Sequence, residues 1–172
     1  LNNEKTIGIS IIKINEKIDE GKIICKTEFK NLKKDNIKNV QKKANKLFLA
    51  LTLKAIKNII EGKTMLKQTM SNTYFKQRKD NDALINFDQT NLKVFNLVRS
   101  QSSPYKGAFF FNKKKKYRLH ECKMTSISPN LRSGEIFKFR NKKEIYIKCK
   151  YKSIKVIKIL PKKNFLKIVK TI

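Results

Sequence analysis

Two runs of β-branched residues, joined by a short polar loop, set the strongest constraint on how this chain can fold. The first run, residues 6–14, carries Ile at partly alternating positions, and the second begins at Ile23. Such runs are typical of strands covered on at least one face, and Gly21 marks the return between them. The polar loop residues favour a turn, and we expect Ile18, the one apolar residue among them, to point inward. The stretch therefore predicts two buried strands joined by a tight acidic loop.

Asp19 lies within this polar loop. An isolated Asp in such a loop is most often a turn former, because its carboxylate accepts hydrogen bonds from nearby backbone N–H groups. On residue type alone we favour this structural role over a catalytic one.

One long amphipathic helix is expected after the second strand. Apolar residues recur at three- and four-residue steps over residues 37–59, and Lys occupies many of the other positions. The apolar positions are Ile37, Val40, Ala44, Leu47, Phe48, Leu51, Ala55, Ile56 and Ile59. Asp35 or Asn36 suits the N-cap, and Gly62 suits the left-handed position just after the helix. We expect the apolar stripe to pack on the preceding strands, with a partner helix as the alternative.

The hydrophobic period is lost over residues 64–87, which indicates a domain boundary. In an extended conformation, Tyr74, Lys76 and Arg78 would point to one side. An aromatic ring with two cations suits stacking on a base and holding a diphosphate. The alternative is a solvated linker with Phe75 anchored in the core.

The last third of the chain has a β pattern. A short helix over residues 91–100 is followed by apolar segments separated by turn residues. The expected strands are 108–111, 117–124, 134–139, 145–149 and 154–160. Short strands at this spacing predict a small barrel or sandwich. Residues 113–116, all Lys, would form a hairpin tip that we expect to be solvated rather than bound to an anion.

The chain is strongly basic, with a formal net charge of +29 from 42 Lys and Arg against 13 Asp and Glu. Only five of these cations are Arg, the residue type that reads phosphates and base edges with paired hydrogen bonds. The excess is Lys, which together with abundant Asn and Ile is typical of compositional drift in an AT-rich genome. We therefore interpret the charge as a diffuse solvated coat, which still attracts anionic substrates.

Cysteine and histidine usage argues against a metal centre. Cys25, Cys122 and Cys149 are far apart and lack C-x-x-C spacing, which favours a reducing compartment over disulfides. His120 is the only His, so a zinc site with several His ligands cannot form within this chain. We expect His120 to have a structural role. No apolar run approaches the ~20 residues that cross a bilayer. We expect a cytoplasmic protein without a membrane partner.

Three segments, in the same order as in the family, resemble the folate-dependent formyltransferases. This group includes methionyl-tRNA formyltransferase and the sugar-nucleotide N-formyltransferases. TIGISI and IDEGKII, within residues 6–24, resemble its Asp-loop. YFKQRKDNDALINF, residues 74–87, is similar to its inter-domain segment, and VRSQSSPYKGAF, residues 98–109, is similar to its Arg-then-aromatic-Pro-Gly-Ala segment.

The resemblance implies an α/β fold, in which the C-terminal part of a Rossmann-like formyltransferase domain precedes a small OB-like β-barrel domain. Residues 1–65 would end the catalytic domain, 66–90 would be the inter-domain segment, and 91–172 would form the OB-like domain. The family's Asn-x-His motif would lie upstream of Leu1. We therefore expect the chain to be a fragment of a longer enzyme that is inactive alone.

The resemblance also implies a reaction, in which a formyl group moves from 10-formyltetrahydrofolate to a primary amine. Asp19 would be catalytic, by orienting the family's His and stabilising its protonated form. Tyr74, Lys76 and Arg78 would bind the substrate, which we expect to be a nucleotide-linked amino sugar. The alternatives are initiator methionyl-tRNA as acceptor, or a basic β module that binds RNA without catalysis. A homodimer is among the expectations.

Overall fold

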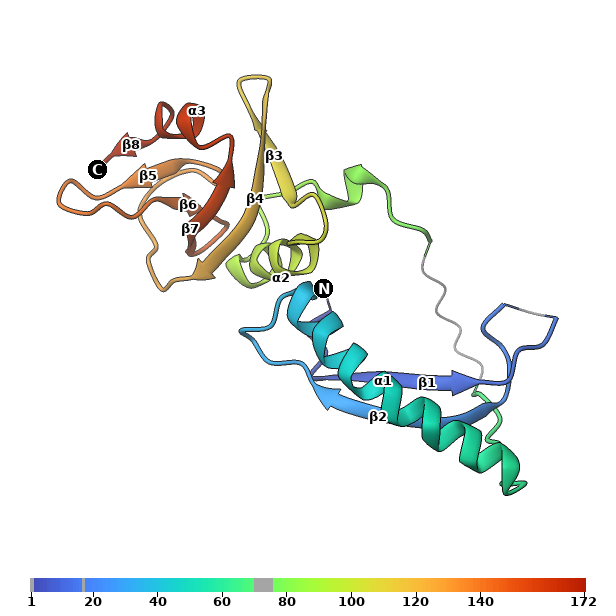
Figure 1. Cartoon of the computed structure of the whole chain (residues 1–172). Helices are drawn as coiled ribbons and strands as arrows, with labels where there is room; N and C mark the ends of the chain where they lie inside the picture. Colours follow the sequence, from blue (N-terminus) through green and yellow to red (C-terminus); the bar gives the residue numbers. More distant parts are fainter. Residues whose placement is uncertain (1, 17, 70–75) are drawn as a thin grey trace. The chain divides into compact units, whose positions relative to one another are not determined.

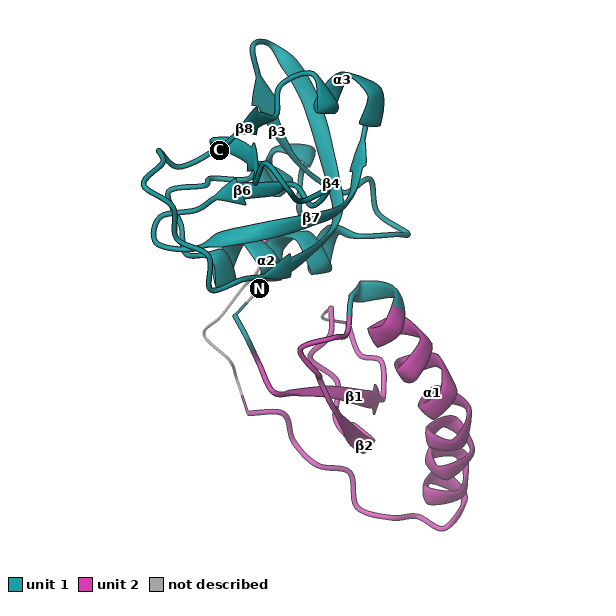
Figure 2. Ribbon diagram, turned by 90° about the vertical axis from the view of Figure 1, so that its left-hand side faces the viewer, with its two compact units in different colours: residues 1–3, 36–38, 78–172 teal, residues 4–35, 39–77 magenta. Residues whose placement is uncertain are grey.

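The computed structural model describes residues 2–16, 18–69 and 76–172, and the chain divides into two compact units (Figure 2). Residues 4–35 and 39–77 form the hairpin unit, and residues 1–3, 36–38 and 78–172 form the sheet unit. Each unit has a hydrophobic cluster of its own. The division between residues 77 and 78 falls inside the segment where the hydrophobic period is lost.

The hairpin unit is built on two antiparallel strands, β1 (Thr6–Ile12) and β2 (Ile23–Lys30), followed by all but the first two residues of the helix α1 (Ile37–Ile60) (Figure 1). Leu51 and Ala55 of α1 are buried beside Cys25 of β2. The side chains of Ile9 and Ile11 of β1 pack partly buried against the same cluster. Both predicted strands and the predicted packing of the helix on them are confirmed, but the strands are only partly buried, since Cys25 is the one buried residue in them.

The end of α1 is formed as its sequence predicts. Gly62 has a φ of 62°, in the left-handed region that glycine adopts at low cost. The Gly62 N–H donates to the Ile59 carbonyl at 3.1 Å, and the Lys63 N–H donates to the Asn58 carbonyl at 2.9 Å. These two bonds are the Schellman arrangement, and they satisfy carbonyls that the helix end would otherwise leave unpaired.

A second side of α1 is apolar and uncovered in the hairpin unit. We expected Phe48, Ile56 and Ile59 to lie on the face of the helix that packs on the strands. This expectation is wrong, because their side chains are about half exposed. A two-stranded sheet is narrow and covers only one stripe of the helix, the stripe that contains Leu51 and Ala55. Despite its exposed apolar residues, α1 is not apolar enough to cross a bilayer, and no other helix in the described part of the chain is long and apolar enough to do so.

The sheet unit contains a six-stranded sheet in the order β3-β4-β7-β6-β5-β8, with three helical segments around it (Figure 1). Its elements are the short 3₁₀ helix η1 (Asp80–Ala83), α2 (Asn91–Gln101), β3 (Ala108–Asn112), β4 (Lys115–Met124), β5 (Ile136–Lys138), β6 (Tyr146–Lys148), β7 (Ser153–Leu160), α3 (Lys162–Leu166) and β8 (Lys170–Thr171). Neighbouring strands are antiparallel except β5 and β8, which are parallel. The order ends at β3 and β8, so no closed barrel is found among the described residues, and the expected OB-like barrel is not confirmed.

An aromatic cluster forms the centre of the sheet unit. The rings of Phe110 and Tyr117 stack with centroids 5.6 Å apart, and Phe165 of α3 meets Tyr117 edge-on at 5.7 Å. Ile85 and Phe87, which follow η1, are buried in the same cluster. The chain therefore joins the sheet unit well before α2 begins, and this fixes the position of η1, whose last residue, Ala83, is buried.

Candidate active site

The loop between β1 and β2 closes through its backbone. The Lys13 N–H donates to the Lys22 carbonyl at 2.9 Å. Gly21 is buried, and a Cβ at this position would lie 1.7 Å from the Lys13 carbonyl oxygen. This distance is far shorter than a van der Waals contact, so the loop can close in this way only with glycine at position 21.

Gln68, from beyond α1, holds the loop from the other side. Its Nε2 donates to the carbonyls of Asp19 at 2.8 Å and Gly21 at 2.7 Å. Ile23 and Leu66 exchange two backbone hydrogen bonds nearby, at 2.8 and 2.9 Å. The sequence did not reveal Gln68, because a single Gln in a polar segment belongs to no periodic pattern.

The Asp19 side chain is exposed, and its carboxylate makes no hydrogen bond or ion pair with any residue that the structure describes. Its φ is 58°, a left-handed conformation that costs free energy for any residue with a Cβ, although Asp tolerates it better than most. A turn-forming Asp would accept backbone N–H bonds, and Asp19 accepts none from the described residues. The loop therefore presents a strained residue whose carboxylate is exposed, a combination that occurs at functional sites.

The expectation that Ile18 points inward is wrong, since its side chain is 90% exposed. The loop is closed by Gly21 and by the amide of Gln68, so it needs no apolar anchor of its own. Ile14, at the other side of the loop, is also exposed. Asp19 thus lies in a loop that presents two apolar side chains to its surroundings.

Of the three residues predicted to bind substrate, the structure describes Lys76 and Arg78. Tyr74 lies outside the described residues. Lys76 is exposed in the hairpin unit, and Arg78 is exposed in the sheet unit. Because the two cations belong to different units, their placement on one side of an extended segment stays a prediction.

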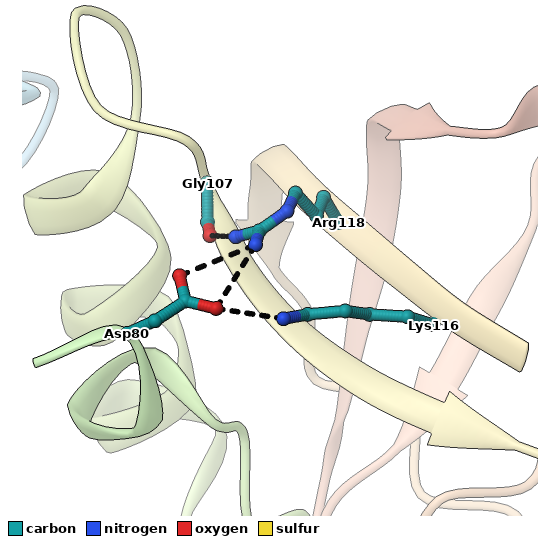
Figure 3. A network of polar contacts seen from close by, with 4 residues as sticks. All are labelled: Asp80, Gly107, Lys116 and Arg118. Carbon is teal, nitrogen blue, oxygen red and sulfur yellow. Dashed lines mark hydrogen bonds and ion pairs between the residues drawn. The ribbon is translucent and has the colours of Figure 1, made fainter. Parts of the chain in front are cut away.

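Asp80, two residues after Arg78, ties the inter-domain segment to the sheet (Figure 3). One carboxylate oxygen accepts from Lys116 Nζ at 2.7 Å, and both accept from Arg118 Nη2, at 3.1 and 3.2 Å. Arg118 Nη1 also donates to the Gly107 carbonyl at 3.1 Å. The hydrogen bonds from Lys116 and Arg118 lower the pKa of Asp80 to about 2. The network fixes the start of η1. No sequence pattern indicated it, because Lys116 and Arg118 are 36 and 38 residues away from Asp80.

We expect Asp80→Asn to flatten the acid dependence of the thermal unfolding temperature. The folded pKa of about 2 lies below the ordinary value of 3.8. The stabilisation is therefore fully present above the ordinary value and is lost as the pH falls through the folded pKa. Circular dichroism melts from about pH 5 to about pH 2 should show a smaller decline for the variant than for the wild type. Asp88→Asn, at an exposed Asp, serves as control, and a decline as steep in Asp80→Asn as in the wild type would contradict this role.

The other titratable groups of the sheet unit do not form a reactive site. Burial raises the pKa of Cys122 and that of Cys149 to about 12, so both thiols stay protonated at neutral pH. Partial burial, with the charges of Lys158 and Arg118, lowers the pKa of His120. Among the described residues, no three His, Cys, Asp or Glu side chains gather closely enough to hold a metal ion.

Comparisons with known proteins agree with the resemblance in the sequence. The family model "Formyl transferase, C-terminal domain" matches residues 78–172. The bifunctional polymyxin resistance protein ArnA of Wigglesworthia glossinidia brevipalpis is 28% identical over 159 residues, covering 91% of this chain and 24% of the relative. The methionyl-tRNA formyltransferase of Thermodesulfovibrio yellowstonii is 30% identical over 142 residues, covering 82% of this chain and 45% of the relative. The chain thus spans less than half the length of either relative.

A solved structure shares the fold across nearly the whole chain. The sugar 3N-formyltransferase WlaRD, determined in the presence of dTDP and 5-N-formyl-THF, superposes with a TM-score of 0.67 at 23% identity. The match covers 94% of this chain and 57% of WlaRD. Because the family model matches more than half of the chain, including all of the large sheet, the chain belongs to the formyltransferase family.

Proposed function

We propose that this chain carries the Asp-loop and the C-terminal domain of an N-formyltransferase that acts in the cytoplasm on a nucleotide-linked amino sugar. The observation that carries the proposal is Asp19, an exposed carboxylate without a hydrogen-bond partner among the described residues, in a loop that Gln68 holds in place. Formyl transfer requires a base to take a proton from the acceptor amine. A free carboxylate can orient an imidazole base and stabilise its protonated form.

The formyl donor that we propose is 10-formyltetrahydrofolate, which supplies the formyl group when bound. The chemistry of the loop fits one wall of a folate site. Pterin rings are flat and carry N–H donors, and the loop offers the Asp19 carboxylate as an acceptor with exposed Ile14 and Ile18 as apolar surface. Ile14 and Ile18 would exclude water from the reacting atoms, and Asp19 would hold a proton on the neighbouring base.

The acceptor amine loses one proton to the base as its nitrogen bonds to the formyl carbon. The bond from that carbon to the donor nitrogen breaks, and the donor nitrogen gains a proton. The task of Asp19 is to stabilise the positive charge on the neighbouring base rather than to carry the proton itself. It is therefore a positioning residue, and the base comes from the half of the family's length that this chain does not cover.

Initiator methionyl-tRNA is the second candidate acceptor. It is favoured by the relative that is 30% identical, a methionyl-tRNA formyltransferase, and by the Lys-rich hairpin tip between β3 and β4. The sugar nucleotide is favoured by the sequence of residues 74–78, which resembles the sugar-nucleotide branch of the family.

An acceptor assay on the protein as its gene encodes it separates the two substrates. We expect Arg78→Gln to raise the KM for a dTDP-linked amino sugar about tenfold with little change in kcat, because one charge-assisted hydrogen bond to phosphate is lost. Methionyl-tRNA formylation should be unaffected. Lys123→Gln, which removes an exposed charge from β4, is the control. Transfer to methionyl-tRNA alone would reject the sugar-nucleotide proposal in favour of the second candidate.

A further inference from the structure

A groove of about 630 Å³ lies beside the second half of β7 in the sheet unit. It is lined by residues 156–160 of β7, by residues 143–145 just before β6, and by residues of α3, which follows β7 (Figure 1). We call it the β7 groove. All of its lining residues belong to the sheet unit, and none belongs to the site described above. The proposed formyl transfer therefore does not account for it.

The β7 groove exists because β7 is longer than its neighbour β6. All three residues of β6 pair with β7, and the last hydrogen bond on this side runs from the Val156 N–H to the Ile145 carbonyl at 2.8 Å. Residues 158–160 pair with β4 on the other side. Within the described part of the chain, no backbone hydrogen bond joins residues 157–160 to anything except β4. The end of β7 therefore has a free edge, and such an edge is a template for another strand.

The β7 groove is apolar along its length. The side chains of Ile145, Val156 and Phe165 belong to the central cluster of the sheet unit or pack against it. Leu160 and Leu166 line the same groove and are 50% and 52% exposed. Apolar side chains gathered on one surface gain free energy when a partner removes them from water. The groove thus suits a partner that brings apolar side chains to the free edge.

The charge of the β7 groove selects the kind of partner. Lys143, Lys158 and Lys162 have exposed side chains in its lining, and none of them forms an ion pair with a described residue. Glu144, the acid in the lining, is already paired, since it accepts from Lys155 at 3.1 Å. Lys at a strand edge opposes pairing with a second copy of the same chain, because like charges would meet. The same cations attract a partner that carries carboxylates.

An extended peptide uses all of these features at once. Its backbone pairs with the free edge, its alternate side chains enter the groove, and the side chains between them reach the Lys residues. A helix would leave the strand edge unused, because it satisfies its own backbone groups. Single-stranded nucleic acid needs aromatic faces for stacking, and Phe165, the ring in the lining, is fully buried.

We propose that the β7 groove is a docking site for another protein, which adds an extended segment of alternating apolar and acidic residues to the free edge of β7. Leu160 and Leu166 would contact its apolar side chains. Lys143, Lys158 and Lys162 would contact its carboxylates. The docking site does not depend on the formyl-transfer reaction or on its substrate.

The test is a fluorescence anisotropy titration of the protein as its gene encodes it with a labelled peptide of alternating Val and Glu, capped at both ends. We expect Leu166→Ala to weaken binding about tenfold, because part of the apolar contact is lost. Leu84→Ala, at a leucine of similar exposure outside the groove, is the matched control and should change nothing. Lys158→Gln should weaken binding about tenfold, and Lys123→Gln, also outside the groove, should not.

Peptides methylated on their backbone nitrogens test the pairing with β7. Methylation of all Val amides blocks one edge of the extended peptide, and methylation of all Glu amides blocks the other. We expect one of these peptides to lose its binding and the other to keep it. Equal affinities of the two methylated peptides and the unmethylated one would overturn strand addition.

A scrambled peptide of the same composition separates specific docking from diffuse charge. We expect it to bind about tenfold more weakly, because its apolar side chains no longer lie on one face. Equal affinity of the scrambled peptide, or equal losses in Lys158→Gln and Lys123→Gln, would overturn the proposal. Failure of the alternating peptide to bind would also overturn it, whether or not decanoate or a single-stranded RNA binds in its place.

Discussion

Replacing Asp19 with Asn is expected to lower the kcat of formyl transfer by about 10²- to 10⁴-fold, the range over which enzymes depend on positioned acid and base groups. Asn keeps the shape of the side chain and tolerates the left-handed backbone at position 19. It cannot stabilise a protonated imidazole. The thermal unfolding temperature should stay unchanged, because the carboxylate makes no hydrogen bond with the described residues.

The pH profile distinguishes a positioning role from a structural one. A nearby carboxylate raises the pKa of a His base, so its loss in Asp19→Asn should move the limb of kcat/KM that rises with pH to lower pH. Asp19→Glu should restore part of the rate, and Glu16→Gln, which removes another acid of the same loop, should leave it unchanged. If Asp19→Asn lowered the rate no more than Glu16→Gln does, the catalytic role would be wrong.

Gly21→Ala is expected to disrupt the loop and to destabilise the hairpin unit by about 3 kcal/mol, the upper part of the usual cost of overpacking. The added Cβ would lie 1.7 Å from a backbone oxygen, at Lys13, which cannot rotate away as a flexible side chain could. The loop must open, and Asp19 then loses the position that Gln68 gives it. Urea unfolding followed by circular dichroism measures the free energy, and the formyl-transfer rate reports on the site.

Gly8→Ala is the matched control for this substitution. Gly8 lies in β1 of the same hairpin, and a Cβ there would meet nothing closer than 4.0 Å. We expect this change to be nearly neutral in both measurements. Equal effects of the two substitutions would show that the close approach of Gly21 to Lys13 is not what closes the loop.

The parts of the fold that the sequence predicted are those with a strong local period. β1, β2 and α1 follow from β-branched runs and from apolar residues spaced at three and four positions. Gly62 ends α1 as expected, because only a residue that adopts a positive φ easily fits there. The helix α3 and the strand β8 were not predicted. They are five and two residues long, which is too short to show a hydrophobic period.

The parts that the sequence could not predict depend on contacts between distant residues. Asp80 meets Lys116 and Arg118 across more than thirty residues, and Gln68 reaches Asp19 across 49. The order of the strands in the sheet is likewise a matter of long-range pairing. The exposed side of α1 was misassigned because the helix is apolar on more than one side, so periodicity alone did not identify the buried stripe.

The measurement that tests the central claim most directly is formyl transfer by the protein as its gene encodes it. Incubation with 10-formyltetrahydrofolate and a dTDP-linked amino sugar, followed by mass spectrometry, should yield the formamide of the sugar, and Asp19→Asn should abolish most of it. The account would be contradicted by the absence of product with this acceptor and with methionyl-tRNA. Salt-sensitive RNA binding that is indifferent to Asp19→Ala would then identify a non-catalytic binding module.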